Sequence, residues 1–417
     1  MKDDFDGDVA EGFRLTRRDV MLSGVGVVSG FVASNGVGSH VDAGEVKPNV
    51  YKRLGIQPVI NAAGTLTNLG GSLMPPEVTA AWLDASEHFV DLLELQDKVG
   101  EQIAKWIGVE AALVTTGAAG AMLLATAATV TRGDPDAIGR LPDTSGLKNQ
   151  VITQASHHTC YDHQITNCGV KLIDVETRDE LERAINDRTA MMLFYNLFEP
   201  DGKIKREEWV AVAREYNIPT LLDAAADVPP LAALFKYNRM GFDMVAFSGG
   251  KALLGPNDTG LLLGRRELIE AAKLNNAPRC GNIGRMMKVS KENMVALWAA
   301  VERYVRVDHD AEWREWQRRL EVVEDALKGL TTVRTERFVP PIANHVPHLL
   351  VHWDENAVKI TCDEVSSKLA KGTPPIRLGR VRGTGDQGLL ISVFMLKPGE
   401  VEIVSRQLAT VLCDAAA

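Results

Sequence analysis

The sequence has few cysteines, no excess of positive charge and no internal repeat. Its five cysteines are odd in number and widely scattered, so they predict no disulfide framework. The formal net charge of −9 argues against a nucleic-acid partner, because binding to a phosphate backbone needs clustered Lys and Arg. What the chain does have is length and apolar content: 417 residues, 45% of them hydrophobic, predict a large core divided between two domains.

The N-terminal residues are typical of an export signal. Arg17 and Arg18 precede a weakly apolar, glycine-rich stretch at residues 23–33, which is too short for a stable membrane span. We expect a twin-arginine signal over residues 1–43, cleaved after Ala43, and a periplasmic or extracellular mature protein without a membrane span. The alternative is a disordered N-terminal arm on a cytoplasmic protein.

One lysine lies among small residues between two apolar runs. Ser248 follows the apolar residues 244–247 and opens the sequence SGGK, which ends at Lys251, and a second apolar run occupies residues 260–264. Burial in an apolar site lowers the pKa of an amine and makes it nucleophilic, which suits a covalent bond to an aldehyde cofactor. A turn whose lysine points into water would give the same pattern.

An aspartate ends an earlier apolar run. Asp223 follows residues 218–222 and precedes Lys251 by 28 positions (251 − 223 = 28). A carboxylate at the end of a buried strand can keep the ring nitrogen of pyridoxal 5'-phosphate (PLP) protonated, while a lysine on a later loop holds its aldehyde. The two residues together predict a PLP site.

A turn of small residues supplies a candidate phosphate site. A predicted strand ends at Thr116, and Gly117 and Ala118 open an alanine-rich helix that runs to about residue 130. A helix N-terminus presents free backbone N–H groups and a positive dipole end to an anion. Tight packing alone would explain such a turn, but its place before the aspartate and the lysine favours a phosphate cradle.

This order of motifs resembles fold-type I PLP-dependent enzymes. Four stretches resemble, more narrowly, the branch that contains selenocysteine synthase and the D-glucosaminate-6-phosphate ammonia-lyases: residues 59–65 (VINAAGT), 154–157 (QASH), 248–251 (SGGK) and 283–292 (IGRMMKVSKE). The resemblance covers nearly everything after residue 50. It implies an α/β fold with a mostly parallel large-domain sheet and a small α+β C-terminal domain.

The resemblance also assigns a role to the segment after a predicted strand at residues 150–154. His157 would stack its ring on the face of the cofactor, while Tyr161 and His163 would pack against or cap the following helix. A metal site in this histidine-rich segment is not expected, because neighbouring ligands on one short turn rarely converge on a tetrahedral point.

Substrate contacts are implied from three other segments. An arginine of the small domain would bind the substrate carboxylate, with Arg377 favoured over Arg380 and Arg382, although each could be a solvated strand-edge charge. Thr65 belongs to an N-terminal loop that would line the site. Arg285 would contact the cofactor phosphate or an anionic substrate, or else belong to a basic turn before a helix.

Alternating apolar and amphipathic segments predict the domain organisation. Residues 1–43 are expected to be the signal, residues 44–290 a PLP-binding large domain, and residues 291–417 a bridging helix and the small domain. Large-domain strands are expected at residues 150–154, 170–175, 190–196, 219–223, 243–248 and 260–264, and small-domain strands near 333, 348–353, 376–381 and 389–393. Parallel strands place functional residues at their carboxyl ends.

The predicted activity is that of a PLP-dependent lyase. Lys251, once displaced from the cofactor by an amino acid, would be the nearest base for the α-proton. The resemblance favours α,β-elimination with release of ammonia and a 2-oxo acid, by a homodimer or higher homo-oligomer. The alternatives are an amino-acid racemase or aminotransferase, and a PLP-binding protein without turnover.

Overall fold

The computed structural model describes residues 49–379 and 388–416, and the chain divides into two units, residues 1–55 and 56–417. In the first unit the described residues form one short helix, α2 (Val50–Arg53), which the Asn49 side chain caps. The predicted signal residues Arg17, Arg18 and Ala43 lie outside the described residues. Within the described part of the chain, no helix is long and apolar enough to cross a membrane.

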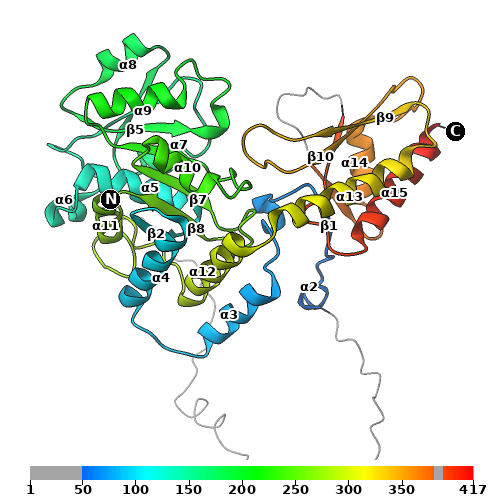
Figure 1. Ribbon diagram of the computed structural model, residues 1–417, viewed down its shortest axis with the longest axis horizontal. Coiled ribbons are helices and arrows are strands. Elements are labelled where there is room, and N and C mark those ends of the chain that lie inside the picture. Colours follow the sequence, from blue (N-terminus) through cyan, green and yellow to red (C-terminus); the bar gives the residue numbers. More distant parts are fainter. Residues whose placement is uncertain (1–48, 380–387, 417) are drawn as a thin grey trace, which may run out of the picture. The chain divides into compact units, whose positions relative to one another are not determined.

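Seven strands of the second unit form one sheet (Figure 1). They are β2 (Ala111–Thr115), β3 (Gln150–Gln154), β4 (Lys171–Val175), β5 (Thr189–Tyr195), β6 (Thr220–Asp223), β7 (Met244–Ser248) and β8 (Gly260–Gly264), in the order β2-β8-β7-β6-β5-β3-β4 across the sheet. Strands β3 to β7 run parallel to one another, whereas β8 is antiparallel to both of its neighbours. The predicted mostly parallel sheet is therefore confirmed.

Helices cover both faces of this sheet, which is why its strands are apolar along most of their length. Every residue of β5 is buried, with Tyr195 and Leu193 pointing to one face and Phe194 and Met192 to the other. The first face packs under α5 (Gly117–Thr131) and α11 (Arg266–Leu274), and the second under α4 (Leu92–Ile107), α9 (Arg206–Glu215), α10 (Ala233–Met240) and α12 (Lys291–Arg306). We call these two sides the α5 face and the α9 face.

Shorter elements connect the strands. They are η1 (Thr67–Leu69), α3 (Pro76–Ser86), α6 (Pro135–Arg140), α7 (Asp162–Thr166), α8 (Arg178–Ala184) and η2 (Asn196–Phe198). The helix α8 begins with a capping box, in which Thr177 and Glu180 exchange hydrogen bonds with each other's backbone.

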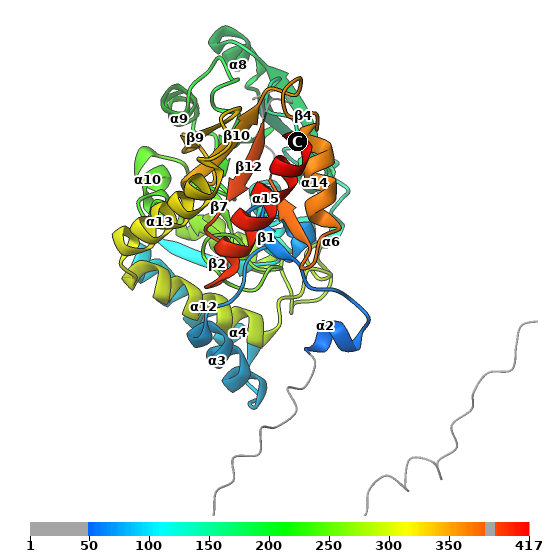
Figure 2. The ribbon, with the colours of Figure 1, turned by 90° about the vertical axis from the view of Figure 1, so that its right-hand side faces the viewer.

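A second, smaller core is built from the C-terminal part of the chain. Its elements are α13 (His309–Leu327), β9 (Val333–Phe338), β10 (His348–Trp353), α14 (Cys362–Ala370), β11 (Ile376–Leu378), β12 (Leu389–Ser392) and α15 (Glu400–Ala416). The strands β12, β10 and β9 form an antiparallel sheet, and Figure 2 shows α13, α14 and α15 beside it. This is the α+β arrangement that the sequence predicts.

One N-terminal strand belongs to this smaller core. β1 (Ile60–Ala62) pairs in parallel with β11, in a register that places Ile60 opposite Ile376, and its apolar side chains pack among those of the C-terminal helices. The sequence analysis assigned these residues to the large domain, within residues 44–290. Three residues with two buried side chains carry too little pattern to show which core they enter.

Candidate active site

The carboxyl ends of the central strands collect the polar residues predicted from the sequence. Thr116 follows β2, Asp223 ends β6 and Ser248 ends β7, while Lys251 lies in the loop after β7. Because Tyr195 of β5 pairs in register with Asp223 of β6, both side chains point to the α5 face. The candidate site therefore lies at one edge of the sheet, next to the N-terminus of α5.

The N-terminus of α5 forms an open cradle. Thr116 occupies the N-cap position without a side-chain capping bond, and Gly117 has a φ of 66°, in the left-handed region that favours glycine. Counting from the start of α5, the first backbone N–H that has a hydrogen-bond partner is that of Gly120, which donates to the Thr116 carbonyl at 3.0 Å. Among the described residues, the N–H groups of Gly117 and Ala118 have no partner, as an anion site requires.

Asp223 is anchored by its own turn. Its Oδ1 atom accepts a hydrogen bond of 3.0 Å from the Ala225 N–H. Burial raises the pKa of the Asp223 carboxyl from its ordinary value to about 6, and the nearby positive charge of Lys251 opposes that rise. A bound cation, such as a protonated ring nitrogen, would restore the carboxylate form.

Lys251 is enclosed, and burial lowers the pKa of its amine, while Asp223 and Asp227 favour the charged form. The two positions before Lys251 are glycines because neighbouring atoms leave no room for a Cβ there. A Cβ on Gly250 would lie 2.4 Å from the Asn257 Cα, and a Cβ on Gly249 would lie 2.3 Å from the Thr259 Oγ1. The lysine loop is thus fixed by close backbone packing rather than by side-chain bonds.

The loop of Ser248 is tied to the turn of Asp223. The Ser248 N–H donates to the Ala225 carbonyl at 3.2 Å, which joins the end of β7 to the residues after β6. The N-terminal loop joins the same assembly, because a Cβ on Gly71 would lie 2.5 Å from the Gly250 carbonyl oxygen. Thr65 is buried within this N-terminal loop, close in sequence to that contact.

His157 does not lie where its predicted role requires. Its side chain is fully buried, and its ring makes an edge contact with Phe194, with centroids 4.5 Å apart, on the α9 face. Its Nε2 atom lies 3.1 Å from the Phe198 carbonyl oxygen, and burial lowers the pKa of His157 to about 4. The prediction that His157 stacks on the cofactor is therefore corrected: this neutral histidine packs in the core on the opposite side of the sheet.

Two tyrosines lie close enough to Asp223 for its charge to raise their pKa. Tyr161 is 46% exposed, and burial of its hydroxyl together with the charge of Asp223 raises its pKa. Tyr195 is buried and donates its hydroxyl to Asp162 at 3.0 Å. The sequence analysis assigned Tyr161 to packing, and the only signal for another role was an aromatic ring in the loop that contains His157.

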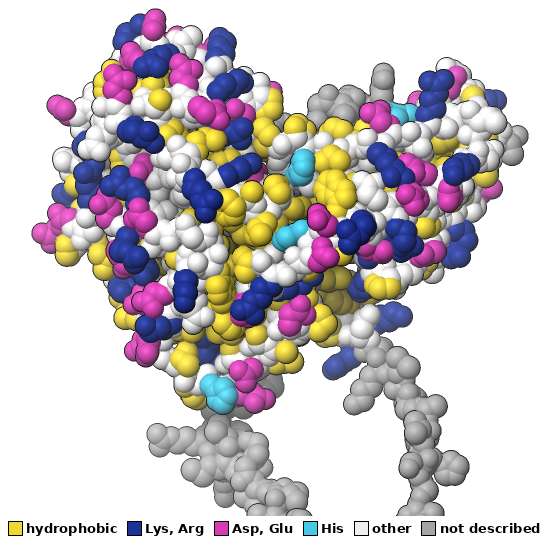
Figure 3. Space-filling model, in the orientation of Figure 1, with side chains coloured by type: hydrophobic (Ala, Val, Ile, Leu, Met, Phe, Trp, Pro, Cys, Tyr) yellow, Lys and Arg dark blue, Asp and Glu magenta, His cyan; other side chains and the backbone are white. Residues whose placement is uncertain are grey.

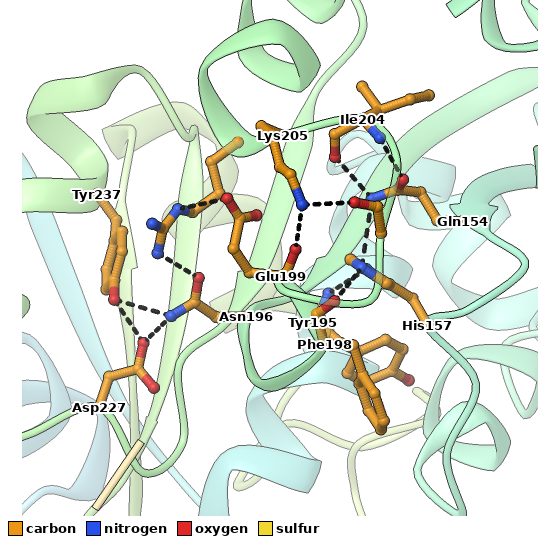
Figure 4. Close-up of polar contacts among 12 residues, drawn as sticks. Gln154, His157, Tyr195, Asn196, Phe198, Glu199, Ile204, Lys205, Asp227 and Tyr237 are labelled. Carbon is orange, nitrogen blue, oxygen red and sulfur yellow. Dashed lines mark hydrogen bonds and ion pairs between the residues drawn. The ribbon is translucent and has the colours of Figure 1, made fainter. Parts of the chain in front are cut away.

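A polar network that the sequence did not reveal joins η2, α10 and the turn after β6 (Figure 4). Its centre is the buried Asp227, whose Oδ2 accepts hydrogen bonds from the Tyr237 hydroxyl at 2.6 Å and from the Asn196 amide. The Asn196 carbonyl in turn accepts a bond of 2.8 Å from Arg206. Only the spacing of four residues from Asp223 could have suggested a role for this second acid.

Of the predicted arginines, the structure describes Arg377 and Arg285 and shows both exposed. Arg377 is exposed on β11, opposite Asn61 of β1, whereas Arg380 and Arg382 lie outside the described residues. Arg285 is exposed in the segment before α12, and that segment contacts α5 through Gly284, where a Cβ would lie 2.7 Å from a Leu124 methyl group. Their roles stay predictions.

Two hollows lie elsewhere on the molecule. One of about 640 Å³ is lined by Pro219 and Asp243, which precede β6 and β7, so it lies at the opposite edge of the sheet from Lys251. Another of about 390 Å³ reaches Leu254 in the lysine loop and Phe394 of the smaller core. Figure 3 shows apolar side chains gathered in the hollowed middle of one face of the molecule. In the described part of the chain, no group of three or more His, Cys, Asp or Glu could hold a metal ion.

Comparisons with known proteins agree with this geometry. The family described as L-seryl-tRNA selenium transferase (SelA) matches residues 59–330. A D-glucosaminate-6-phosphate ammonia lyase of Salmonella typhimurium is 30% identical over 336 residues, which are 78% of this chain and 88% of that protein. A 5'-C-glycyluridine monooxygenase-decarboxylase of a Streptomyces species is 29% identical, over 87% of this chain and 92% of that protein.

Solved structures show the same architecture. A D-glucosaminate-6-phosphate ammonia-lyase superposes with a TM-score of 0.77 at 28% identity, covering 89% of this chain and 100% of the other. Serine palmitoyltransferase of Sphingomonas wittichii superposes with a TM-score of 0.53 at 12% identity, covering 86% and 88% of the two chains, which is a likeness of fold alone. The predicted fold-type I class is confirmed.

The first prediction concerns the packing of β8 against the cradle. A Cβ on Gly260 would lie 2.3 Å from the Gly117 carbonyl carbon, so Gly260→Ala must displace the first turn of α5. We expect a loss of about 1–3 kcal/mol in the free energy of unfolding, with weaker PLP binding. Denaturant titration and absorbance titration with PLP measure the two effects.

Gly139→Ala is the matched control, because a Cβ at this glycine of α6 meets nothing within 4 Å. It should leave PLP affinity unchanged. Equal PLP affinity in Gly260→Ala and the wild type would show that α5 does not form the phosphate cradle.

The second prediction concerns pH and Asp223 in the cofactor-free protein. With a pKa of about 6 when folded and an ordinary value of 3.8, Asp223 keeps its proton longer in the folded state. Folding stability should therefore fall as pH rises from about 4 to about 6. Asp223→Asn removes this loss and should be more stable than the wild type at pH 7.5 by about 1–3 kcal/mol. Denaturant unfolding at pH 4.5 and pH 7.5 measures the difference; a gap between the two proteins that is equal at both pH values would contradict it.

Proposed function

Because the chain belongs to the L-seryl-tRNA selenium transferase family and is a PLP-dependent enzyme, we propose that it is a lyase acting on an amino acid. The proposed reaction removes the α-proton and a β-leaving group and releases ammonia and a 2-oxo acid. The observation that carries the proposal is the burial of Lys251 beside Asp223, at the edge of the sheet where α5 begins. The 30% identity to an ammonia lyase supports this outcome.

The side chains present fit PLP at each of its polar ends. The free N–H groups of Gly117 and Ala118 suit the phosphate, and the carboxyl of Asp223 suits the ring nitrogen. Bound PLP supplies an electron sink for the negative charge that develops on the substrate Cα. Tyr161, half-exposed beside Asp223, has the position and the ring to cover the cofactor face that His157 cannot reach.

Lys251 performs the proton transfers. Its lowered pKa makes the neutral amine available to take the α-proton, after which its ammonium can protonate the departing β-substituent. Close packing of Gly249 against Thr259 and of Gly250 against Asn257 fixes the backbone that leads to the amine. Asp223, whose Oδ1 accepts a hydrogen bond from the Ala225 N–H, would keep the ring nitrogen of bound PLP protonated.

A second candidate outcome is decarboxylation. It is favoured by the 29% identity to a monooxygenase-decarboxylase over 87% of this chain. The two outcomes share the cofactor and Lys251 but differ in which bond to Cα breaks, and product analysis separates them. Racemisation and transamination share the first proton transfer and are distinguished in the same way.

We propose a homo-oligomer for this enzyme. The last part of α3 and the turn between α3 and α4 expose large apolar side chains: Leu83 of α3 is 55% exposed, and Phe89 and Val90 of the turn are 102% and 50% exposed. Such a cluster is costly in water and suits contact with a second copy of the chain. Sedimentation of the wild type against Phe89→Ser tests it; equal monomeric behaviour of both would reject it.

Export of the folded enzyme is also proposed, on the strength of the pair Arg17 and Arg18. Fractionation of cells expressing the wild type and an Arg17→Lys, Arg18→Lys double variant tests it. The wild type should lose about its first 40 residues and leave the cytoplasm, as removal of a signal requires. Equal export of both proteins would reject a twin-arginine signal.

The third prediction concerns the reaction itself. The purified protein should be yellow, and borohydride should fix the cofactor to Lys251, as mass spectrometry of the peptide will show. A panel of amino acids is screened for ammonia, 2-oxo acid, carbon dioxide and loss of chirality, with Lys251→Ala as the inactive control. Ammonia and 2-oxo acid in equal amounts support the lyase, whereas a wild-type protein that stays colourless and inactive with added PLP would end the proposal.

The fourth prediction separates the two candidate stacking rings. Tyr161→Phe keeps a ring and should keep PLP affinity, whereas Tyr161→Ala should weaken it about fivefold, because ring stacking contributes about 1 kcal/mol. His157→Gln should lower the melting temperature, because its ring packs against Phe194 in the core. Unchanged PLP affinity in Tyr161→Ala would show that another group covers the cofactor.

A further inference from the structure

His158 is an exposed histidine whose two ring nitrogens both face carboxylates. Its Nδ1 atom lies 2.6 Å from Oδ2 of Asp162, the first residue of α7. Its Nε2 atom lies 2.9 Å from Oδ1 of Asp174, which belongs to the edge strand β4. The imidazole therefore bridges α7 and β4.

This arrangement requires a protonated ring. An ionised carboxylate accepts hydrogen bonds and donates none, and a neutral imidazole has a single N–H to donate. Both contacts of His158 are therefore hydrogen bonds when both ring nitrogens carry a proton, and loss of one proton breaks one of them. The hydrogen bond to Asp162 and the charge of Asp174 raise the pKa of His158 above its ordinary value of 6.5, against the effect of partial burial. The neighbouring His157 adds no charge, because burial lowers its pKa to about 4.

Tyr161 lies between the two ends of this bridge, in the turn that joins His158 to α7. Its N–H donates to the Thr159 Oγ1 at 2.7 Å, and the Thr159 N–H donates to Oδ1 of Asp162 at 3.3 Å. The same Oδ1 accepts the Tyr195 hydroxyl at 3.0 Å. The Asp162 carboxylate thus ties the turn of Tyr161 to β5 directly and to β4 through the imidazole.

We propose that protonated His158 is a positioning residue that fixes the turn of Tyr161, so that PLP binds more tightly while this histidine carries its proton. This rests on the part of the proposed function that places Tyr161 over the cofactor face. A ring that is already held in its stacking position loses less conformational freedom when the cofactor binds. Deprotonation of His158 breaks the bridge and leaves that freedom to be lost on binding.

The fifth prediction is a pH profile of PLP affinity. Because the pKa of folded His158 is raised, the contribution of the bridge is fully present below about pH 6.5 and is lost as pH rises through the folded value. His158→Arg carries a charge that does not titrate in this range. From about pH 6 to about pH 9.5 the wild type should lose about two- to fivefold more PLP affinity than His158→Arg, since the effect cannot exceed that of removing the Tyr161 ring. Absorbance titration with PLP measures the affinity, and NMR titration of the His158 ring in the cofactor-free protein measures its pKa.

Three further variants complete the design. Asp174→Asn removes one carboxylate and keeps the histidine, so it should lower the pKa of His158 and move the loss of PLP affinity to lower pH. The Asp174 side chain is 53% exposed, so this variant should fold even if His158→Arg does not. His163→Gln, which changes an exposed histidine of the same helix, should follow the wild-type profile. In a Tyr161→Ala background, His158→Arg should leave the profile unchanged, because His158 acts through that ring.

The outcomes are distinct. A steeper profile in the wild type than in His158→Arg, displaced to lower pH in Asp174→Asn and equal in the two proteins without the Tyr161 ring, supports the proposal. A folded His158→Arg or Asp174→Asn whose profile matches the wild type would overturn it, leaving His158 as a surface ion pair. A difference that persists without the Tyr161 ring would also overturn it. The supporting profiles in a protein that releases neither ammonia nor 2-oxo acid would remove the proposed reaction while this inference stands.

Discussion

The candidate site depends on enclosing one cation and two anions in a space from which water is largely excluded. Burial alone would neutralise each group, lowering the pKa of Lys251 and raising those of Asp223 and Asp227. The attraction between Lys251 and each acid opposes these shifts, whereas the charge of Asp227 adds to the rise at Asp223. Such a balance suits acid–base chemistry, since a group that is fixed in one state can neither take nor return a proton.

Backbone packing holds these charges in place. The lysine loop has few side-chain bonds, but glycines at positions 249, 250 and 260 allow it, β8 and the start of α5 to approach at distances that a Cβ would prevent. The cost is conformational entropy, because glycine has more freedom to lose on folding than other residues.

The sequence predicted the parts of the site that are defined along the chain. The strand ends at Thr116, Asp223 and Ser248 followed from apolar runs with small or polar residues behind them. The structure confirms the ends at Asp223 and Ser248, and it ends β2 at Thr115, one residue before the predicted end. His157 could not be placed in this way, because the residues after a strand turn toward either face of the sheet and no local pattern says which. Its ring packs on the α9 face, against the ring of Phe194.

The sequence also did not predict contacts between segments that lie far apart along the chain. Asp227 accepts hydrogen bonds from Tyr237 and Asn196, which come from separate elements and are brought together only by the fold. The antiparallel direction of β8 leaves no mark in its composition, since all of its residues are buried, as they are in the parallel strand β5.

The pairing of β1 with β11 has a consequence for how the enzyme is made. Ile376, which lies opposite Ile60, is added to the chain 316 residues later (376 − 60 = 316). β1 therefore stays without its partner strand, β11, during most of synthesis. The loop that follows β1 reaches the lysine loop at Gly71. The wall of the site that is translated first is therefore completed last, and a ribosome-bound chain holds an assembled sheet before it holds a closed catalytic pocket.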